Sequence, residues 1–145
     1  MTLRCTPDAA WRALTSPAAF RAVSAPFTGF TSRELYGFPE HWPPGEHRVS
    51  VFAFGVIPIG EQLIDVSFEE RGDTRIFHDD GRGLSGALTL ATGWHHSMAV
   101  SRLPDGRTLY RDQLRFDGPA VLWVAYWAFW QWRGLRLRRL ARGWR

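Results

Sequence analysis

The chain has 145 residues, of which 45% are hydrophobic, so it is about the size of one domain and can bury a core of its own. Its single cysteine, Cys5, excludes an internal disulfide and makes a reducing compartment the expected location. The net charge of +4 does not indicate a nucleic-acid-binding protein, because residues 120–145 hold six arginines and no acidic residue, whereas residues 1–119 hold 12 arginines and 14 acidic residues.

The N-terminal segment lacks the apolar run of a signal peptide, so we expect a cytoplasmic protein. Residues 2–6 are predicted to form a short first strand. Two short helices are expected after it. The first opens at Pro7-Asp8, and the second follows Ser16-Pro17, where serine is a suitable N-cap and proline a suitable first helical residue.

From residue 31 the sequence changes to short runs of alternating polar and apolar residues, separated by turn residues. The predicted strands cover residues 31–36, 48–56, 61–70, 74–80, 88–103 and 107–116. The Pro/Gly-rich segment 37–45 lies between two such runs and is predicted to be a loop within the same domain. The alternation favours an antiparallel sheet with one apolar face and one solvent-facing side, and therefore an α+β fold.

The register of the last hairpin follows from its turn. Pro104-Asp105-Gly106 suits a type I turn closed by a left-handed glycine, which gives a three-residue loop. The cross-strand pairs are then Val100 with Tyr110, Met98 with Asp112, and His96 with Leu114. This register places the apolar positions on one face, whereas a two-residue loop would shift the pairing by one residue.

The C-terminal element is predicted to be a long helix that begins after Pro119. Its first half, residues 120–132, is apolar on all sides, so we expect it to be covered nearly all round. This half is too short to span a bilayer, which needs about 20 apolar residues. The arginine-rich second half fits either a solvated cationic helix end or a peripheral contact with anionic membrane.

The order of these elements resembles that of the START-like, helix-grip superfamily, also called SRPBCC, over nearly the whole chain. Residues 7–17 resemble the superfamily's opening strand-to-helix segment. Four further segments resemble a bacterial branch of the superfamily whose function is unassigned. They are Phe77-His78-Asp79-Asp80, Trp94-His95-His96, Asp105-Gly106-Arg107-Thr108 with Asp112, and Gly118-Pro119.

The resemblance implies a curved antiparallel sheet of six to seven strands, wrapped around the long C-terminal helix, with two short helices after the first strand. It implies a single ligand-binding domain over residues 1–145, with lipids, polyketides, hormones or other apolar molecules held between sheet and helix. Some members are polyketide cyclases or dehydratases. No catalytic motif is shared across the superfamily, so the resemblance assigns no catalytic residue here.

His96 and Asp112 are the candidate residues for chemistry. Alternation places both on the apolar face, and the predicted register makes them diagonal neighbours. A buried carboxylate beside an imidazole is either an acid/base couple or a polar pair satisfied within a cavity wall. We expect Asp79 and Asp80 to form a turn, because adjacent carboxylates point to opposite sides of a strand.

No phosphate-binding loop, nucleophile motif or metal-ligand spacing is present, so no cofactor and no metal are expected. The sequence predicts binding of an apolar small molecule between sheet and helix. The alternatives are a cyclase- or dehydratase-type enzyme using His96 and Asp112, and a module that docks on membrane or protein through residues 120–145. The sequence leaves the oligomeric state open. The predicted lining residues are Phe52, Phe54, Ile64, Val66, His96, Met98, Tyr110, Asp112, Trp123 and Trp127.

Overall fold

The N-terminal segment forms one very short strand and two short helices. The computed structural model describes residues 1–145 and gives their bounds as β1 (Thr2–Leu3), α1 (Pro7–Leu14) and α2 (Pro17–Ser24). The Thr6 hydroxyl accepts a hydrogen bond from the Ala9 amide and caps α1, and a proline occupies the first turn of each helix. The first strand is shorter than predicted, because Thr6 already belongs to the cap of α1.

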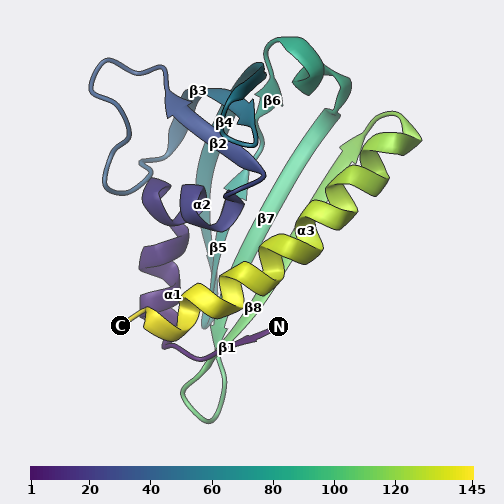
Figure 1. The fold of residues 1–145 in the computed structure, drawn as a ribbon. Coiled ribbons are helices and arrows are strands. Elements are labelled where there is room, and N and C mark those ends of the chain that lie inside the picture. Colours follow the sequence, from purple (N-terminus) through teal and green to yellow (C-terminus); the bar gives the residue numbers. More distant parts are fainter.

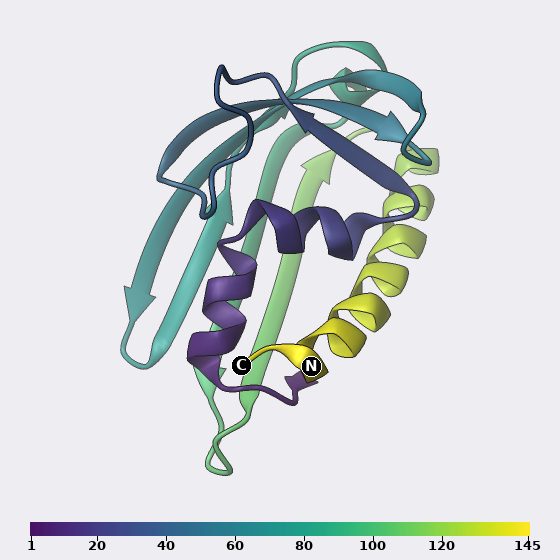
Figure 2. The same cartoon turned by 60° about the vertical axis from the view of Figure 1, so that its left-hand side comes forward.

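The strands form one antiparallel sheet with the order β1-β8-β7-β5-β4-β3-β2, and β6 pairs with β4. The bounds are β2 (Thr28–Ser32), β3 (Gly45–Ala53), β4 (Ile57–Arg71), β5 (Thr74–Asp79), β6 (Arg82–Gly83), β7 (Thr92–Arg102) and β8 (Thr108–Asp117). The predicted α+β class, with the two short helices after the first strand, is confirmed. The sheet is curved and open, because β1 and β2 at its two edges do not pair with each other (Figures 1 and 2).

The ends of the predicted strands lie within four residues of the observed ones, and two of the differences change a neighbouring element. The strand predicted at 31–36 occupies residues 28–32, so the loop after it is longer than expected. The strand predicted at 88–103 begins at residue 92, because Gly86–Leu90 form a short 3-10 helix. Glycine at position 60 lets β4 lie close to the segment that precedes this 3-10 helix, because a Cβ on Gly60 would lie 2.1 Å from the Ser85 carbonyl oxygen.

The predicted register of the β7–β8 hairpin is confirmed. Met98 pairs with Asp112, and His96 pairs with Leu114. Gly106 has a φ of 80°, the left-handed conformation that the turn requires. Because a strand repeats every two residues, this register sends Met98, Tyr110 and Asp112 to the inner face of the sheet.

The inner face of β3 is the reverse of the predicted one. Val49 and Val51 are buried, whereas Phe54 is 63% exposed and has a φ of 51°. A register shift between Val51 and Phe52 and the turn that begins at Phe54 end the alternation on which the prediction depended. The aromatic residues of this hairpin therefore do not belong to the core.

The long helix α3 (Ala120–Leu140) runs obliquely across β7 and β8, and Figure 2 shows α1, α2 and α3 on one side of the sheet. Its first half was expected to be covered nearly all round, but Val121, Val124 and Trp127 are 72%, 68% and 66% exposed. The sheet is open, so it covers only one face of the helix. Both ends of the chain lie in the same half of the molecule (Figure 1). No helix is long and apolar enough to span a membrane.

Candidate functional site

Two buried side chains of opposite charge meet between the sheet and α3. Arg133 on α3 is 5% exposed, and its Nη1 donates to Asp112 Oδ2 on β8 at 2.6 Å. The inward position of Asp112 follows from the register of the last hairpin. Arg133 lies four residues before the buried Leu137, so both belong to the face of α3 that packs on the sheet.

His96 and Tyr110 complete the network around Asp112. His96 Nε2 lies 2.7 Å from Asp112 Oδ1, and the Tyr110 hydroxyl donates to Asp112 Oδ2 at 2.7 Å. Because an ionised carboxylate only accepts hydrogen bonds, the Nε2 of His96 carries the proton in this contact. The other ring nitrogen, Nδ1, has no hydrogen-bond partner in the protein. The predicted proximity of His96 and Asp112 is therefore a direct contact.

The charges of this network support one another. Burial alone would raise the pKa of Asp112, but Arg133, His96 and Tyr110 together hold that pKa well below its usual range. Burial opposes the charge of Arg133, yet Asp112 and Tyr110 raise its pKa. The pKa of Tyr110 is raised well above its usual value by burial and by the nearby carboxylate. Asp112 and Arg133 are therefore a buried ion pair, and Tyr110 stays protonated.

Asp79 is a second buried carboxyl group at the site. It is 6% exposed, it pairs with His96 across β5 and β7, and its Oδ1 accepts from the amides of Asp65 and Gly81. Its Oδ2 accepts from Trp94 Nε1 at 3.2 Å. Burial raises the pKa of Asp79, although His96 and these hydrogen bonds act against the rise. Asp79 was predicted to form a turn, and the hydrogen bond that it accepts from the Gly81 amide does so. The prediction missed that Asp79 is the last residue of β5 and that its side chain is buried.

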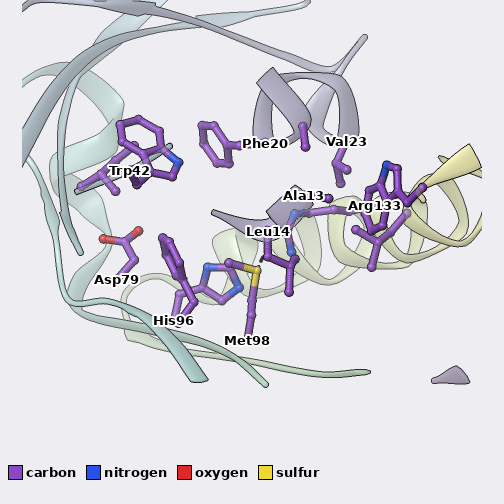
Figure 3. A pocket seen from close by; sticks show the side chains of 14 residues that line it. Ala13, Leu14, Phe20, Val23, Trp42, Asp79, His96, Met98 and Arg133 are labelled. Atoms are coloured by element: carbon purple, nitrogen blue, oxygen red, sulfur yellow. Dashed lines mark hydrogen bonds between the residues drawn. The ribbon is translucent and has the colours of Figure 1, made fainter. Parts of the chain in front are cut away.

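Two cavities meet at these residues. The larger has a volume of about 500 Å³ and extends between α2, the strands β2 to β4 and the middle of α3. The smaller, about 30 Å³, extends toward α1 and the end of α3. Phe20, Asp79, His96 and Arg133 line both cavities. Figure 3 shows the smaller one, with Asp79, His96 and Met98 along one wall and Phe20 and Trp42 opposite.

The larger cavity is mostly apolar and aromatic, and its six polar lining residues are Ser24, Thr28, Gln62, Asp79, His96 and Arg133. The apolar lining comprises Phe20, Phe27, Phe30, Val51, Ile59, Leu88, Trp94, Ala125, Tyr126, Ala128, Phe129, Trp130 and Trp132. Phe27, 42% exposed, contacts the ring of Trp132 at 5.3 Å between centroids. An apolar space with a few convergent polar groups is the usual form of a small-molecule site.

The structure brings together only part of the predicted lining. His96 lines both cavities, and Ile64 and Met98 line the smaller one. Three predicted residues lie at the surface instead, with exposed fractions of 63% for Phe54, 47% for Trp123 and 66% for Trp127. Phe54 is in a turn and Trp127 lies on the uncovered side of α3, whereas Trp123 stacks on Phe116 of β8, with 4.4 Å between ring centroids.

The remaining predicted residues pack near the cavities without lining them. Val66 and Tyr110 are in the solid core, Phe52 is half-buried, and Asp112 lies behind His96 and Arg133. Asp112 therefore acts on the cavity through its two partners.

Sequence reasoning missed Arg133 and Asp79. Arg133 was predicted to belong to a solvated cationic helix end, but it continues the stripe of Tyr126, Phe129 and Leu137 on the packed face of α3. The sequence contains a signal for this position: Arg133 lies at helical spacing from Leu137, and the predicted register places the carboxylate of Asp112 on the inner face of the sheet. Arg136 is also partly buried and donates to the Ala22 carbonyl oxygen at 2.6 Å. The arginines Arg138, Arg139, Arg142 and Arg145 are exposed, as predicted.

Comparison with known proteins gives the fold. No family model and no curated protein matches the chain. Among solved structures, protein CV1439 from Chromobacterium violaceum matches with a TM-score of 0.67 and 16% sequence identity, over 98% of this chain and 93% of that chain. The chain therefore shares its α+β architecture with this bacterial protein, and an antiparallel sheet with a long C-terminal helix is compatible with a helix-grip fold.

Proposed function

We propose that the protein is a START-like, helix-grip domain that binds an apolar small molecule in the 500 Å³ cavity. The observation that carries this proposal is the lining of the cavity, in which 13 of the 19 residues are hydrophobic. The volume lies within the range of about 300–1,000 Å³ that is usual for small-molecule sites. The order of the elements, which resembles that of the SRPBCC superfamily, is consistent with this function.

A cavity-filling variant tests the proposal. N-phenyl-1-naphthylamine is uncharged and becomes fluorescent in apolar surroundings, so it serves as a probe. Val51 is 2% exposed and lines the cavity, so Val51→Trp should reduce binding of the probe by about tenfold or more, because the added ring occupies the same space. Val56→Trp is the matched control, since Val56 is 75% exposed.

Native mass spectrometry of freshly purified wild-type protein supplies the second readout, since a retained molecule identifies the ligand class. Circular dichroism shows whether both variants fold. If the wild-type protein gives no saturable signal, the proposal is wrong. If folded Val51→Trp binds the probe as the wild type does, the probe occupies the exposed face of α3 and the cavity is not the site.

Enzymatic turnover is a second candidate function, and the contact between His96 and Asp112 favours it. Asp112 fixes His96 with the proton on Nε2, which leaves Nδ1 free to accept a proton from a molecule in the cavity. Arg133 would stabilise negative charge that develops on an oxygen atom nearby. His96→Gln should then abolish conversion of the co-purified molecule, followed by mass spectrometry, while probe binding stays intact. Unchanged conversion would exclude His96 as the base.

A further inference from the structure

The hydrogen-bond donors of Arg133 exceed the acceptors that the protein offers them. A guanidinium group has five N–H bonds. One points to Asp112 Oδ2, one points to the sulfur of Met98 at 3.4 Å, and the Tyr110 hydroxyl lies close enough to influence the pKa of the group. At least two N–H bonds therefore lack a protein acceptor, although Arg133 is only 5% exposed. Arg133 lines both cavities, so these N–H bonds are available to a group that occupies that space.

The surroundings of Arg133 restrict where that group can lie. The ring of Trp130 covers the guanidinium, with 4.9 Å from the Arg133 Cζ to the ring centroid. Asp112 occupies one edge. Both cavities adjoin the side chain, and the larger one contains no carboxylate other than Asp79. The free donors are therefore available to a group that enters along the apolar cavity.

The unfilled donors of Arg133 favour an acceptor as that group, and an anion is the strongest hydrogen-bond acceptor. Asp112 is already neutralised by Arg133, and burial raises the pKa of Asp79, which favours its uncharged form. A planar carboxylate matches the two parallel N–H bonds at an edge of the guanidinium, and such bonds are about twice as strong as neutral ones. An amine, by contrast, would gain only the carboxyl group of Asp79.

We propose, building on the proposed binding function, that the ligand is a monocarboxylate with an apolar body. Its carboxylate accepts hydrogen bonds from Arg133 at the inner end of the 500 Å³ cavity, and its apolar body lies along the aromatic lining between α2 and α3. His96, which lines the same end, is a neighbour of that head group.

Displacement of N-phenyl-1-naphthylamine by three matched amphiphiles tests this. Dodecanoate, dodecan-1-ol and dodecylamine share one apolar chain and differ in the charge of the head group. For the wild-type protein at pH 7, dodecanoate should displace the probe at a concentration about tenfold lower than the alcohol, since a charge-assisted hydrogen bond exceeds a neutral one by that factor or more. The amine should be no better than the alcohol.

The double variant Asp112→Asn/Arg133→Met removes both buried charges at once, so no unpaired charge is left in the core. Its displacing concentrations for dodecanoate and dodecan-1-ol should become equal, a ratio that does not depend on the variant's own affinity for the probe. The matched control is Arg138→Gln, which removes one exposed arginine from the same helix and should keep the preference. The control also reveals any attraction of the anion to the surface arginines.

The outcomes separate the two proposals. Equal displacement by all three amphiphiles in the wild type overturns the carboxylate proposal and leaves the apolar binding site intact. A preference for dodecylamine assigns the inner end to a cation and Asp79, and also overturns it. A dodecanoate preference that is lost in Arg138→Gln places the anion at the surface. If the probe does not bind at all, the proposed function itself fails. If the double variant does not fold, displacement of the probe from the wild-type protein and from Arg138→Gln still tests the carboxylate proposal.

Discussion

At the scale of single residues, the ion pair between Asp112 and Arg133 joins β8 to α3 through the core. Both side chains are largely withdrawn from water, with exposed fractions of 13% and 6%. Desolvation of two charges offsets much of their attraction, so the pair adds little net stability compared with apolar residues. Losing one partner is costly, however, because the other charge stays buried without compensation.

Arg133→Met should therefore lower the free energy of unfolding by about 3–5 kcal/mol. The double variant Asp112→Asn/Arg133→Met should recover most of that loss, because neither charge then remains. Urea unfolding at pH 7, followed by tryptophan fluorescence, measures both. If the double variant is as unstable as the single one, the loss comes from packing of the arginine stem and not from the unpaired carboxylate.

The two buried carboxyl groups should give opposite dependence of stability on pH. The pKa of Asp112 is lowered from 3.8, so its stabilisation is present above that pH and is lost as the pH falls below it. The pKa of Asp79 is raised from 3.8, so the unfolded chain loses that proton first, and the wild type becomes less stable as the pH rises above 3.8.

Unfolding of Asp112→Asn and Asp79→Asn across pH 3–7 tests these signs. The stability advantage of the wild type over Asp112→Asn should grow with pH, whereas its advantage over Asp79→Asn should shrink. The asparagine oxygen at position 79 can still accept from the amides of Asp65 and Gly81. Parallel profiles for the two variants would contradict the assignment.

At the scale of elements, the turn residues and the polar/apolar alternation predicted the pairing of the strands. They did not predict which face of α3 packs on the sheet. The contact between His96 and Asp112 follows from a turn sequence and the two-residue period of a strand. The face of α3 that packs on the sheet could not be predicted in the same way, because its first half is apolar on every side. Which stripe is buried depends on the angle at which the helix crosses the sheet, and the local sequence does not set that angle.

Gly106 is the residue on which the β7–β8 register depends. A Cβ there would meet no atom within 4 Å, so the only cost of Gly106→Ala is the backbone strain of a φ of 80°. We expect a loss of about 1 kcal/mol in the free energy of unfolding, and a smaller loss for Gly106→Asn, because asparagine tolerates this conformation. Gly143→Ala is the matched control, since Gly143 also has free space but no positive φ. Equal effects at the two positions would show that the turn is not strained.

At the scale of the whole molecule, the order of the elements was sufficient to predict the α+β fold but not the position of the cavity. The predicted lining included Phe54 and the tryptophans Trp123 and Trp127, which do not border the cavity, and it omitted α2 and β2, which do. A cavity is the space left between elements, so it depends on long-range packing. Small changes in the tilt of α3 decide which side chains border it.

The 500 Å³ cavity is open to solvent on one side, and its apolar walls pack less densely against water than the core packs against itself. Hydrostatic pressure favours the state of smaller total volume, and unfolding commonly reduces the volume by about 20–100 mL/mol, in step with the internal voids that disappear. A molecule that fills the cavity reduces this difference and makes the fold less compressible. Resistance to pressure should therefore rise when the cavity is occupied, whatever the chemistry of its occupant.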